Sequence, residues 1–169
     1  TVNDNPSPTV NDATICPGDS ATLTATDGDT FKWNTPDTGA SITKSPPDTT
    51  TYTVTAKYTN GCDATATGTI YVREAPSVTT NVASSFEICS GYDTTITASA
   101  SGGVGTYDYQ WSNGDMDASI DIAPTADASY QVTVTDDQGC QDSTTVTADV
   151  NALPNVSISN LDSAYCKDI

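Results

Sequence analysis

The sequence predicts an all-β protein, and three observations support this prediction. Threonine and valine, which favour extended strands, are abundant, whereas the good helix formers Leu, Met, Glu, Lys and Arg are scarce. Apolar and polar residues alternate with period two along several segments, as they do in half-buried strands. Short clusters of Gly, Asn, Asp and Pro separate these segments, which is typical of turns between strands. We therefore expect almost no helix.

The expected strands follow one another at short intervals. In the first half they span residues 21–25, 30–33, 40–44 and 51–56, and a turn at residues 58–61 leads into a last strand. In the second half, residues 129–134 repeat the pattern of residues 51–56, and a turn at residues 136–139 again leads into a last strand. About seven short strands in roughly 75 residues is the pattern of an immunoglobulin-like β-sandwich.

The two halves also repeat individual residues. Both contain a Trp, a Tyr and a Cys with spacings of 19 and 10 positions, which are Trp33, Tyr52 and Cys62 and then Trp111, Tyr130 and Cys140. Each set is preceded by a further cysteine, Cys16 or Cys89. The distance from this cysteine to the Trp is longer in the second half, which predicts an insertion in the glycine-rich residues 101–105. A repeat of this kind indicates tandem modules.

The repeat predicts how the chain is divided. We expect the end of a preceding module at residues 1–5, a first module at 6–74, a second module at 75–152 and the start of a third module at 153–169. Cys166 falls where the first cysteine of a module belongs. Short junctions that contain Pro76 and Pro154 leave little hinge freedom, so successive modules should keep a nearly fixed orientation.

The cysteines are expected to form disulfides, because no CxxC pair suggests a metal cluster. The matched spacing pairs Cys16 with Cys62 and Cys89 with Cys140, one bridge within each module. The partner of Cys166 then lies outside the chain. Closing a loop of about 46 residues stabilises a module by roughly 4 kcal/mol, which a small core needs. Trp33 and Trp111 are expected to pack near these bridges.

Composition excludes several function classes. With Lys+Arg 5 and Asp+Glu 22, the net charge of −17 argues against nucleic acid as a partner, and no apolar run is long enough for membrane insertion. The absence of His excludes Ser-His-Asp and Cys-His catalysis. The Asp37-Thr38-Gly39 motif of aspartic proteases occurs once, whereas that chemistry needs two carboxylates, so we expect a plain turn here. The sequence predicts no enzyme.

The second module resembles a known family. Residues 109–114 read Tyr-Gln-Trp-Ser-Asn-Gly, residues 130–136 read Tyr-Gln-Val-Thr-Val-Thr-Asp, and Gly139-Cys140 follows. Over residues 86–150 this combination resembles the SprB-type repeat of very long Bacteroidota surface adhesins, including gliding-motility adhesins exported by type IX secretion. The first module lacks the Gly after Asn34 and has Lys57-Tyr58-Thr59 in place of the Thr-Asp run. It looks more like the generic immunoglobulin-like or PKD-like repeats of the same surface proteins.

The resemblance implies a non-catalytic stalk or adhesin on the outside of a bacterial cell, with neighbouring modules of the same polypeptide as partners. Glycans, surfaces or other copies of the chain are further expected partners. Two alternatives stay open. A carbohydrate-binding accessory module of a secreted enzyme would expose an aromatic platform, for which the candidates are Tyr58, Tyr92, Tyr107 and Tyr109. A subunit of a self-assembling extracellular filament would present extensive contacts between chains.

No cofactor is expected, although aspartate-rich loops offer candidate Ca²⁺ ligands, namely Asp115, Asp117, Asp121, Asp136, Asp137 and Asp142. Solvated turn residues that keep a β protein soluble are the favoured interpretation of these aspartates. Asp-Ser/Thr-small triplets resemble the O-glycosylation signal of Bacteroidota secreted proteins, although chance matches are expected in a chain so rich in Asp and Thr. Their hydroxyl residues are Ser20, Thr49, Thr94, Ser143 and Ser163.

Overall fold

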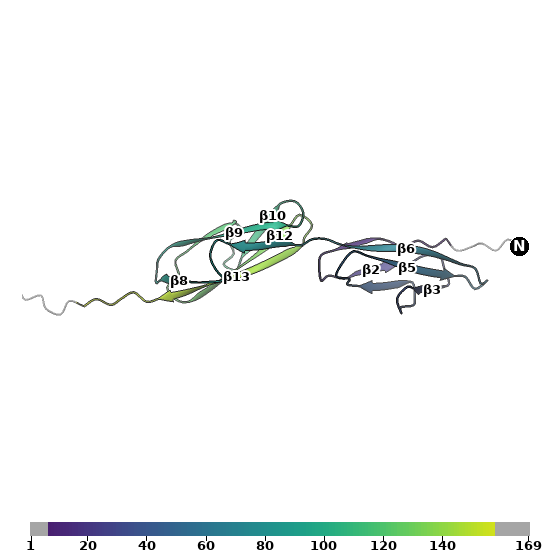
Figure 1. The fold of residues 1–169 in the computed structure, drawn as a ribbon, viewed down its shortest axis with the longest axis horizontal. Coiled ribbons are helices and arrows are strands. Elements are labelled where there is room, and N and C mark those ends of the chain that lie inside the picture. The colour runs from purple at the N-terminus through teal and green to yellow at the C-terminus, as the bar shows by residue number, and fades with distance from the viewer. Residues whose placement is uncertain (1–6, 158–169) are drawn as a thin grey trace, which may run out of the picture.

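A computed structural model describes residues 7–157 of the chain. Within these residues every regular element is a β-strand, and thirteen strands form two sandwiches that follow one another along the chain (Figure 1). No helix that could span a membrane occurs in this part of the chain.

The first module contains six strands: β1 (Ala13–Ile15), β2 (Ala21–Thr24), β3 (Thr30–Trp33), β4 (Ser41–Lys44), β5 (Thr50–Lys57) and β6 (Asp63–Val72). One sheet has the order β1-β6-β5-β3, and β2 and β4 form the other. Strand β1 pairs with β6 in parallel, with Ile15 opposite Val72, whereas the other pairs are antiparallel. The first strand of the module therefore ends where the last strand ends.

The second module contains seven strands: β7 (Pro76–Thr80), β8 (Ser85–Cys89), β9 (Thr94–Gly102), β10 (Tyr107–Trp111), β11 (Ser119–Ile122), β12 (Ala128–Asp136) and β13 (Gln141–Asn151). Its sheets have the orders β10-β12-β13-β8 and β11-β9-β7. Strand β8 repeats the role of β1, because it pairs in parallel with the last strand and places Ile88 opposite Val150.

Each sandwich has its own core, built from the inward-facing residues that alternate along each strand. The buried residues of the first core are Ile15, Leu23, Ala25, Trp33, Ile42, Tyr52, Val54 and Ile70. Those of the second are Val78, Ile96, Ala98, Trp111, Ile120, Ile122, Val132, Val134 and Val146. The predicted all-β, tandem immunoglobulin-like architecture is confirmed, and both tryptophans are core residues.

The first module has one strand fewer than expected, because its counterpart of β7 is reduced to a single bridge between Val10 and Ala25. The side chain of Asn11 makes two further hydrogen bonds to β2 beside this bridge, as Asn81 does to β9 in the second module. Its Oδ1 accepts the N–H of Thr24 at 2.7 Å, and its Nδ2 donates to the carbonyl of Thr22 at 3.2 Å.

The predicted disulfides within modules are wrong. The described part of the chain contains one bridge, Cys16–Cys140, which joins the two modules, and it leaves Cys62 and Cys89 as free thiols. Cys62 precedes β6, whereas Cys16 follows β1 beside the far end of β6, so ten residues of strand, about 33 Å, separate the two cysteines. The eleven residues of β13 separate Cys140 from Cys89 in the same way. A disulfide needs Cα atoms within about 7 Å of each other. Cys166 lies outside the described residues.

Candidate functional site

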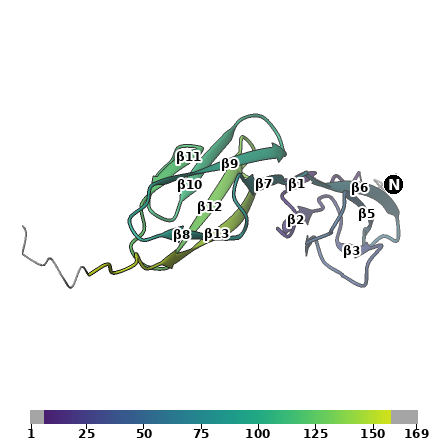
Figure 2. The same cartoon turned by 60° about the vertical axis from the view of Figure 1, so that its left-hand side comes forward.

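The junction between the modules is the most distinctive site of the molecule. Only Arg73, Glu74 and Ala75 connect the end of β6 to the start of β7. At this point the two sandwiches meet end to end (Figure 2). A linker of three residues is short enough for side chains of one module to reach the next.

A disulfide forms a second covalent connection across the junction. Cys16 follows β1 of the first module, and Cys140 ends the turn between β12 and β13 of the second. Their Cα atoms are 5.4 Å apart, and Cys140 is almost fully buried at 1% exposure. Because 124 positions separate the two cysteines, the bridge encloses most of both modules in one covalent loop.

Asp136 organises the turn that carries Cys140. Its Oδ1 accepts the N–H groups of Gln138 and Cys140, and its Oδ2 accepts the N–H of Val104, each at 2.9 Å. Burial by itself would raise the pKa of Asp136, but these three N–H groups and the nearby charge of Arg73 hold the pKa below its ordinary value. A charged, hydrogen-bonded Asp136 therefore fixes the turn that presents Cys140 to the first module.

The glycine-rich insertion of the second module lies at this same junction. Gly102 and Gly103 have φ values of 74° and 63°, a conformation that favours glycine. A Cβ atom on Gly103 would lie 2.8 Å from Asp136 Oδ2 and 3.1 Å from the backbone nitrogen of Pro76. The sequence indicated an insertion here, but it gave no sign that the insertion packs between the linker and the last turn.

A shallow pocket of about 440 Å³ opens beside the bridge, and both modules line it. The first module contributes Cys16 and Arg73 among others, and the second contributes Gln138 and Gly139. Arg73 is half-buried here, and its backbone N–H donates to the carbonyl of Ile15 at 3.0 Å. Sequence reasoning missed Arg73, although it is one of only five basic residues and stands directly after a predicted strand.

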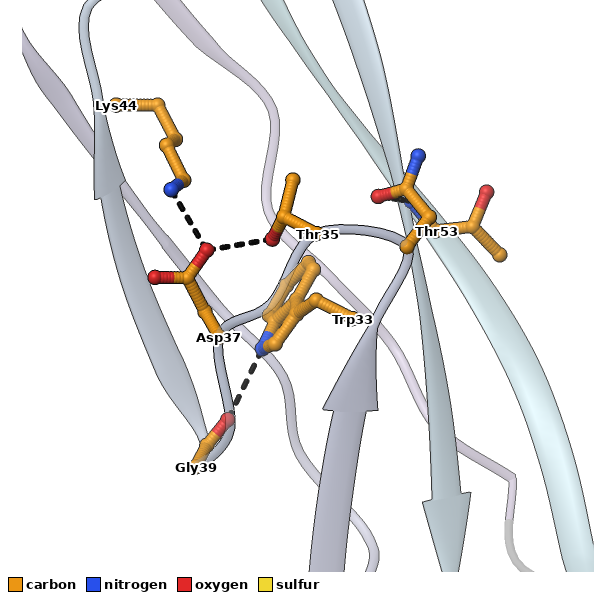
Figure 3. Close-up of polar contacts among 7 residues, drawn as sticks. Trp33, Thr35, Asp37, Gly39, Lys44 and Thr53 are labelled. Carbon is orange, nitrogen blue, oxygen red and sulfur yellow. Dashed lines mark hydrogen bonds and ion pairs between the residues drawn. The ribbon is translucent and has the colours of Figure 1, made fainter.

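The Asp37-Thr38-Gly39 motif forms a structural turn, as expected (Figure 3). Trp33 Nε1 donates to the carbonyl of Gly39 at 3.0 Å, while Thr35 Oγ1 donates to Asp37 at 2.5 Å. Lys44 Nζ lies 2.6 Å from the Asp37 carboxylate. The bond from Lys44, together with that from Thr35, lowers the pKa of Asp37. The carboxylate is engaged in holding the turn that covers Trp33.

The candidate calcium ligands are spread over several elements. Asp115 accepts from Asn113 at 2.6 Å, Asp121 from Thr95 at 2.5 Å and Asp137 from Thr106 at 2.6 Å. Asp142 accepts the N–H of Val78 at 2.8 Å, and the carbonyl of Asp117 accepts from Trp111. Over residues 7–157, no three acidic or cysteine side chains are grouped so that they could hold a metal ion.

The candidate glycosylation residues lie on different elements of both modules. Ser20, Thr49 and Ser143 are exposed, and Thr94 is half-buried. The hydroxyl of Thr49 also accepts the N–H of Val72 at 3.0 Å. Ser163 lies outside the described residues.

The four candidate platform tyrosines do not form one surface. Tyr58 donates its hydroxyl to Asp27 in the first module, whereas Tyr92 is 64% exposed in the turn after β8. Tyr107 and Tyr109 on β10 line a shallow pocket with Met116, but both also pack against the second core. Only Tyr107 and Tyr109 are neighbours on one face of a strand.

Comparison with known protein families finds a match in the second module. The family model of the SprB repeat matches residues 87–116, which include Cys89 and Trp111. No curated protein matches significantly.

Several solved structures are similar to the chain. The N-terminal eight immunoglobulin domains of Down Syndrome Cell Adhesion Molecule match with a TM-score of 0.53 and 14% identity, over 86% of this chain and 24% of that one. The fibronectin(III)-like modules of Clostridium thermocellum CbhA match with a TM-score of 0.42 and 13% identity, over 90% of this chain and 100% of that one. Three N-terminal domains of the bacteriophage RB49 outer capsid protein Hoc match with a TM-score of 0.43 and 18% identity, over 86% of this chain and 58% of that one.

The chain thus spans 58% of the capsid protein structure and about a quarter of the adhesion molecule structure. At 14% identity the likeness to the adhesion molecule shows the fold alone. The match at residues 87–116 lies within the second sandwich and agrees with the resemblance seen in its sequence. Residues 87–116 therefore match the SprB repeat, and they lie in a tandem array of immunoglobulin-like β-sandwiches.

Proposed function

We propose that the chain is a stiff, non-catalytic segment of a long tandem-repeat protein on a bacterial surface, where it serves as a stalk or adhesin. Its modules span residues 6–74 and 75–152, with parts of neighbouring modules at 1–5 and 153–169. SprB repeats and immunoglobulin-like sandwiches are typically structural or adhesive modules, which supports this role. The net charge of −17 would keep neighbouring rods apart at low ionic strength.

The observation that carries the proposal is the disulfide across the junction. A single flexible linker allows one module to bend and twist freely relative to the next. Here the linker and the Cys16–Cys140 bridge attach the modules at two places, so the remaining freedom is rotation about the line that joins these attachments. The glycine-rich insertion of the second module lies against the linker, since a Cβ atom on Gly102 would lie 3.3 Å from the carbonyl oxygen of Ala75, and this packing opposes that rotation. Stiffness of this kind suits a protein that holds something at a distance from the cell.

Small-angle X-ray scattering of the full chain tests the stiffness. The oxidised chain should scatter as one elongated shape, and the Cys16→Ser/Cys140→Ser variant should scatter as a broader ensemble of bent shapes. Cys62→Ser/Cys89→Ser is the matched control, because it removes two thiols and leaves the bridge intact. Equal flexibility of the oxidised chain and the bridge-less variant would contradict the proposal.

Deletion of residues 75–152 from the full-length parent tests the cellular role. A stalk loses reach but keeps its function, so surface adhesion should remain near normal while the protein becomes shorter. Complete loss of adhesion, with the shortened protein still displayed on the cell, would instead place a specific binding site in the second module.

The carbohydrate-binding alternative has less support, because the candidate tyrosines lie on different elements and two of them contribute to the core. A glycan array with the full chain would detect such binding directly.

A further inference from the structure

The free thiol Cys62 occupies the same position in the first module as the bridged Cys140 in the second. Tyr58 N–H donates to the Cys62 carbonyl at 2.9 Å, and Asp136 N–H donates to the Cys140 carbonyl at 3.0 Å. Within the turns, Gly61 N–H donates to Tyr58 and Gly139 N–H to Asp136 at 3.0 and 2.9 Å. The same turn therefore presents a cysteine at the start of the last strand in both modules.

The free thiol Cys89 is likewise equivalent to the bridged Cys16. Each follows an isoleucine whose partner on the last strand is a valine, Ile15 with Val72 and Ile88 with Val150. Each also accepts the backbone N–H of the residue three positions later at 3.1 Å. Cys16 and Cys89 thus end the same strand and begin the same turn.

The two free cysteines lie at the outer ends of the two-module unit. Cys62 is at the end of the first module that faces away from the junction, and Cys89 lies beside Asn151 at the end of β13. Cys140 is 1% exposed at the junction, whereas Cys62 is half-buried and Cys89 is exposed. The spacing from Val150 to Pro154 equals that from Val72 to Pro76, so the next junction has a linker of the same length.

We propose that Cys62 and Cys89 form the same bridge as Cys16–Cys140, with the preceding and the following module respectively. The first cysteine of each module is joined to the turn cysteine of the next, which produces a ladder of inter-module disulfides along the array. The Cys16–Cys140 bridge supports this pairing, because its two cysteines are the equivalents of Cys89 and Cys62 in this same molecule. The proposal rests on the proposed function, because it requires neighbouring modules.

Each bridge forms when two thiols lose two protons and two electrons to a small disulfide oxidant. The oxidant, for example glutathione disulfide, first forms a mixed disulfide with one cysteine and is then displaced by the second. Two molecules of the small thiol leave, and one S–S bond has formed in the protein.

The ladder limits how far the array can be stretched. The shortest covalent path runs from Cys16 through the bridge to Cys140 and then along the chain to Cys166, the first cysteine of the next module, 26 positions later. This path leads from one module to the second module after it, and it is about 90 Å long when fully extended. Two folded modules have a similar length, since their last strands of 10 and 11 residues and two three-residue linkers also come to about 90 Å. The array therefore keeps nearly its folded length even when modules unfold.

A tandem protein tests the ladder directly. It consists of this chain up to Leu153, followed without a spacer by Pro8 to Ile169 of a second copy, so that Cys89 of the first copy faces Cys62 of the second across a linker of the natural length. The protein has nine cysteines. After oxidation in a glutathione mixture, thiol alkylation should find three free thiols, and peptide mapping should find Cys89 of the first copy linked to Cys62 of the second.

Two substitutions serve as matched controls. Cys62→Ser in the second copy should remove the new bridge and leave four free thiols, whereas Cys62→Ser in the first copy should keep all three bridges and leave two. Five free thiols in the unsubstituted tandem protein, with both Cys16–Cys140 bridges formed, would overturn the ladder and leave the proposed stiff segment unaffected. If the proposed stiffness is wrong, the oxidised natural chain will instead bend in the scattering experiment.

Discussion

Asp136 illustrates how one side chain can secure the turn that carries Cys140. It is the one buried charged or polar residue of the described chain, at 4% exposure, and it satisfies three backbone N–H groups of two loops. The first module has Tyr58 at the equivalent position, whose hydroxyl instead bonds to Asp27 of the neighbouring loop. Both modules thus tie the last turn to the loop before the strand that carries the tryptophan, β3 or β10, but they use different chemistry.

Asp136 should make the stability of the second module depend on pH. Its pKa is lower in the folded chain, so its carboxylate contributes stability above the unfolded pKa of about 3.9, and this contribution is lost as the pH falls through the lowered folded value. Asp136→Asn should therefore lower the melting temperature at pH 7, and the difference from the natural chain should shrink below about pH 4. Asp137→Asn, which alters an exposed neighbour, is the control. A difference between Asp136→Asn and the natural chain that does not change with pH would contradict this role.

The two repeated tyrosines should not be equivalent in stability. Tyr52 is buried at 7% exposure, whereas Tyr130 is half-buried at the edge of its core. Tyr52→Ala should destabilise the first module by about 3–5 kcal/mol, as large aromatic deletions do, and Tyr130→Ala should cost the second module clearly less. Denaturant unfolding of the two variants measures both values. Equal losses would mean that exposure does not distinguish the two sites.

At the scale of strands, the two modules differ in the residue that lies opposite the repeated tyrosine. Gly68 lies opposite Tyr52 on β6, and Val146 lies opposite Tyr130 on β13. A Cβ atom on Gly68 would lie 2.3 Å from Val10 Cγ1 and 2.8 Å from the carbonyl oxygen of Asn11. The close approach of residues 10–11 to β6 is therefore possible only because position 68 is glycine.

Gly68→Ala should strain the first module. The added methyl group meets backbone as well as a side chain, so neither can move away cheaply, and overpacking of this kind costs about 1–3 kcal/mol. Chemical denaturation of the variant should show this loss. Thr67→Ala, on the exposed face of the same strand, should change stability little and serves as the control. An unchanged Gly68→Ala variant would show that residues 10–11 can shift freely.

For the whole molecule, the bridge determines which residues carry a pulling force. A load applied to the two ends of the chain passes from Cys16 directly to Cys140, so most of both sandwiches lies in a loop that bears no tension. Without the bridge, the same load must pass through both modules in series.

Single-molecule pulling of the full chain should reveal this path. The oxidised chain should never release the loop between the bridged cysteines, which are 124 positions apart, whereas Cys16→Ser should release it, which adds roughly 400 Å of extended chain. Cys62→Ser should behave like the natural chain because it leaves the bridge in place. Release of the full length by the oxidised natural chain would show that the bridge does not carry the load.

Much of the architecture could be predicted from local patterns. Alternation along residues 51–56 and 129–134 identified β5 and β12, and residues 30–33 match β3. The Trp-Tyr-Cys spacing identified the repeat, and the strands and cores of the two modules follow it. These features depend on neighbours in sequence, which is why sequence alone was sufficient.

The disulfide pairing depended on tertiary structure. Matched spacing shows which cysteines of the two modules are equivalent, but it cannot show whether a cysteine bonds to one in its own module or to one in the next module. The parallel pairing of β1 with β6 places Cys16 at the junction end, a full strand length from Cys62, and the turn at residues 136–139 places Cys140 at that same end. The sequence by itself thus determined the strands, the repeat and the equivalence of the cysteines. Only the tertiary structure decided the pairing, because the direction of a strand pair, which no local pattern records, determines at which end of a module each thiol lies.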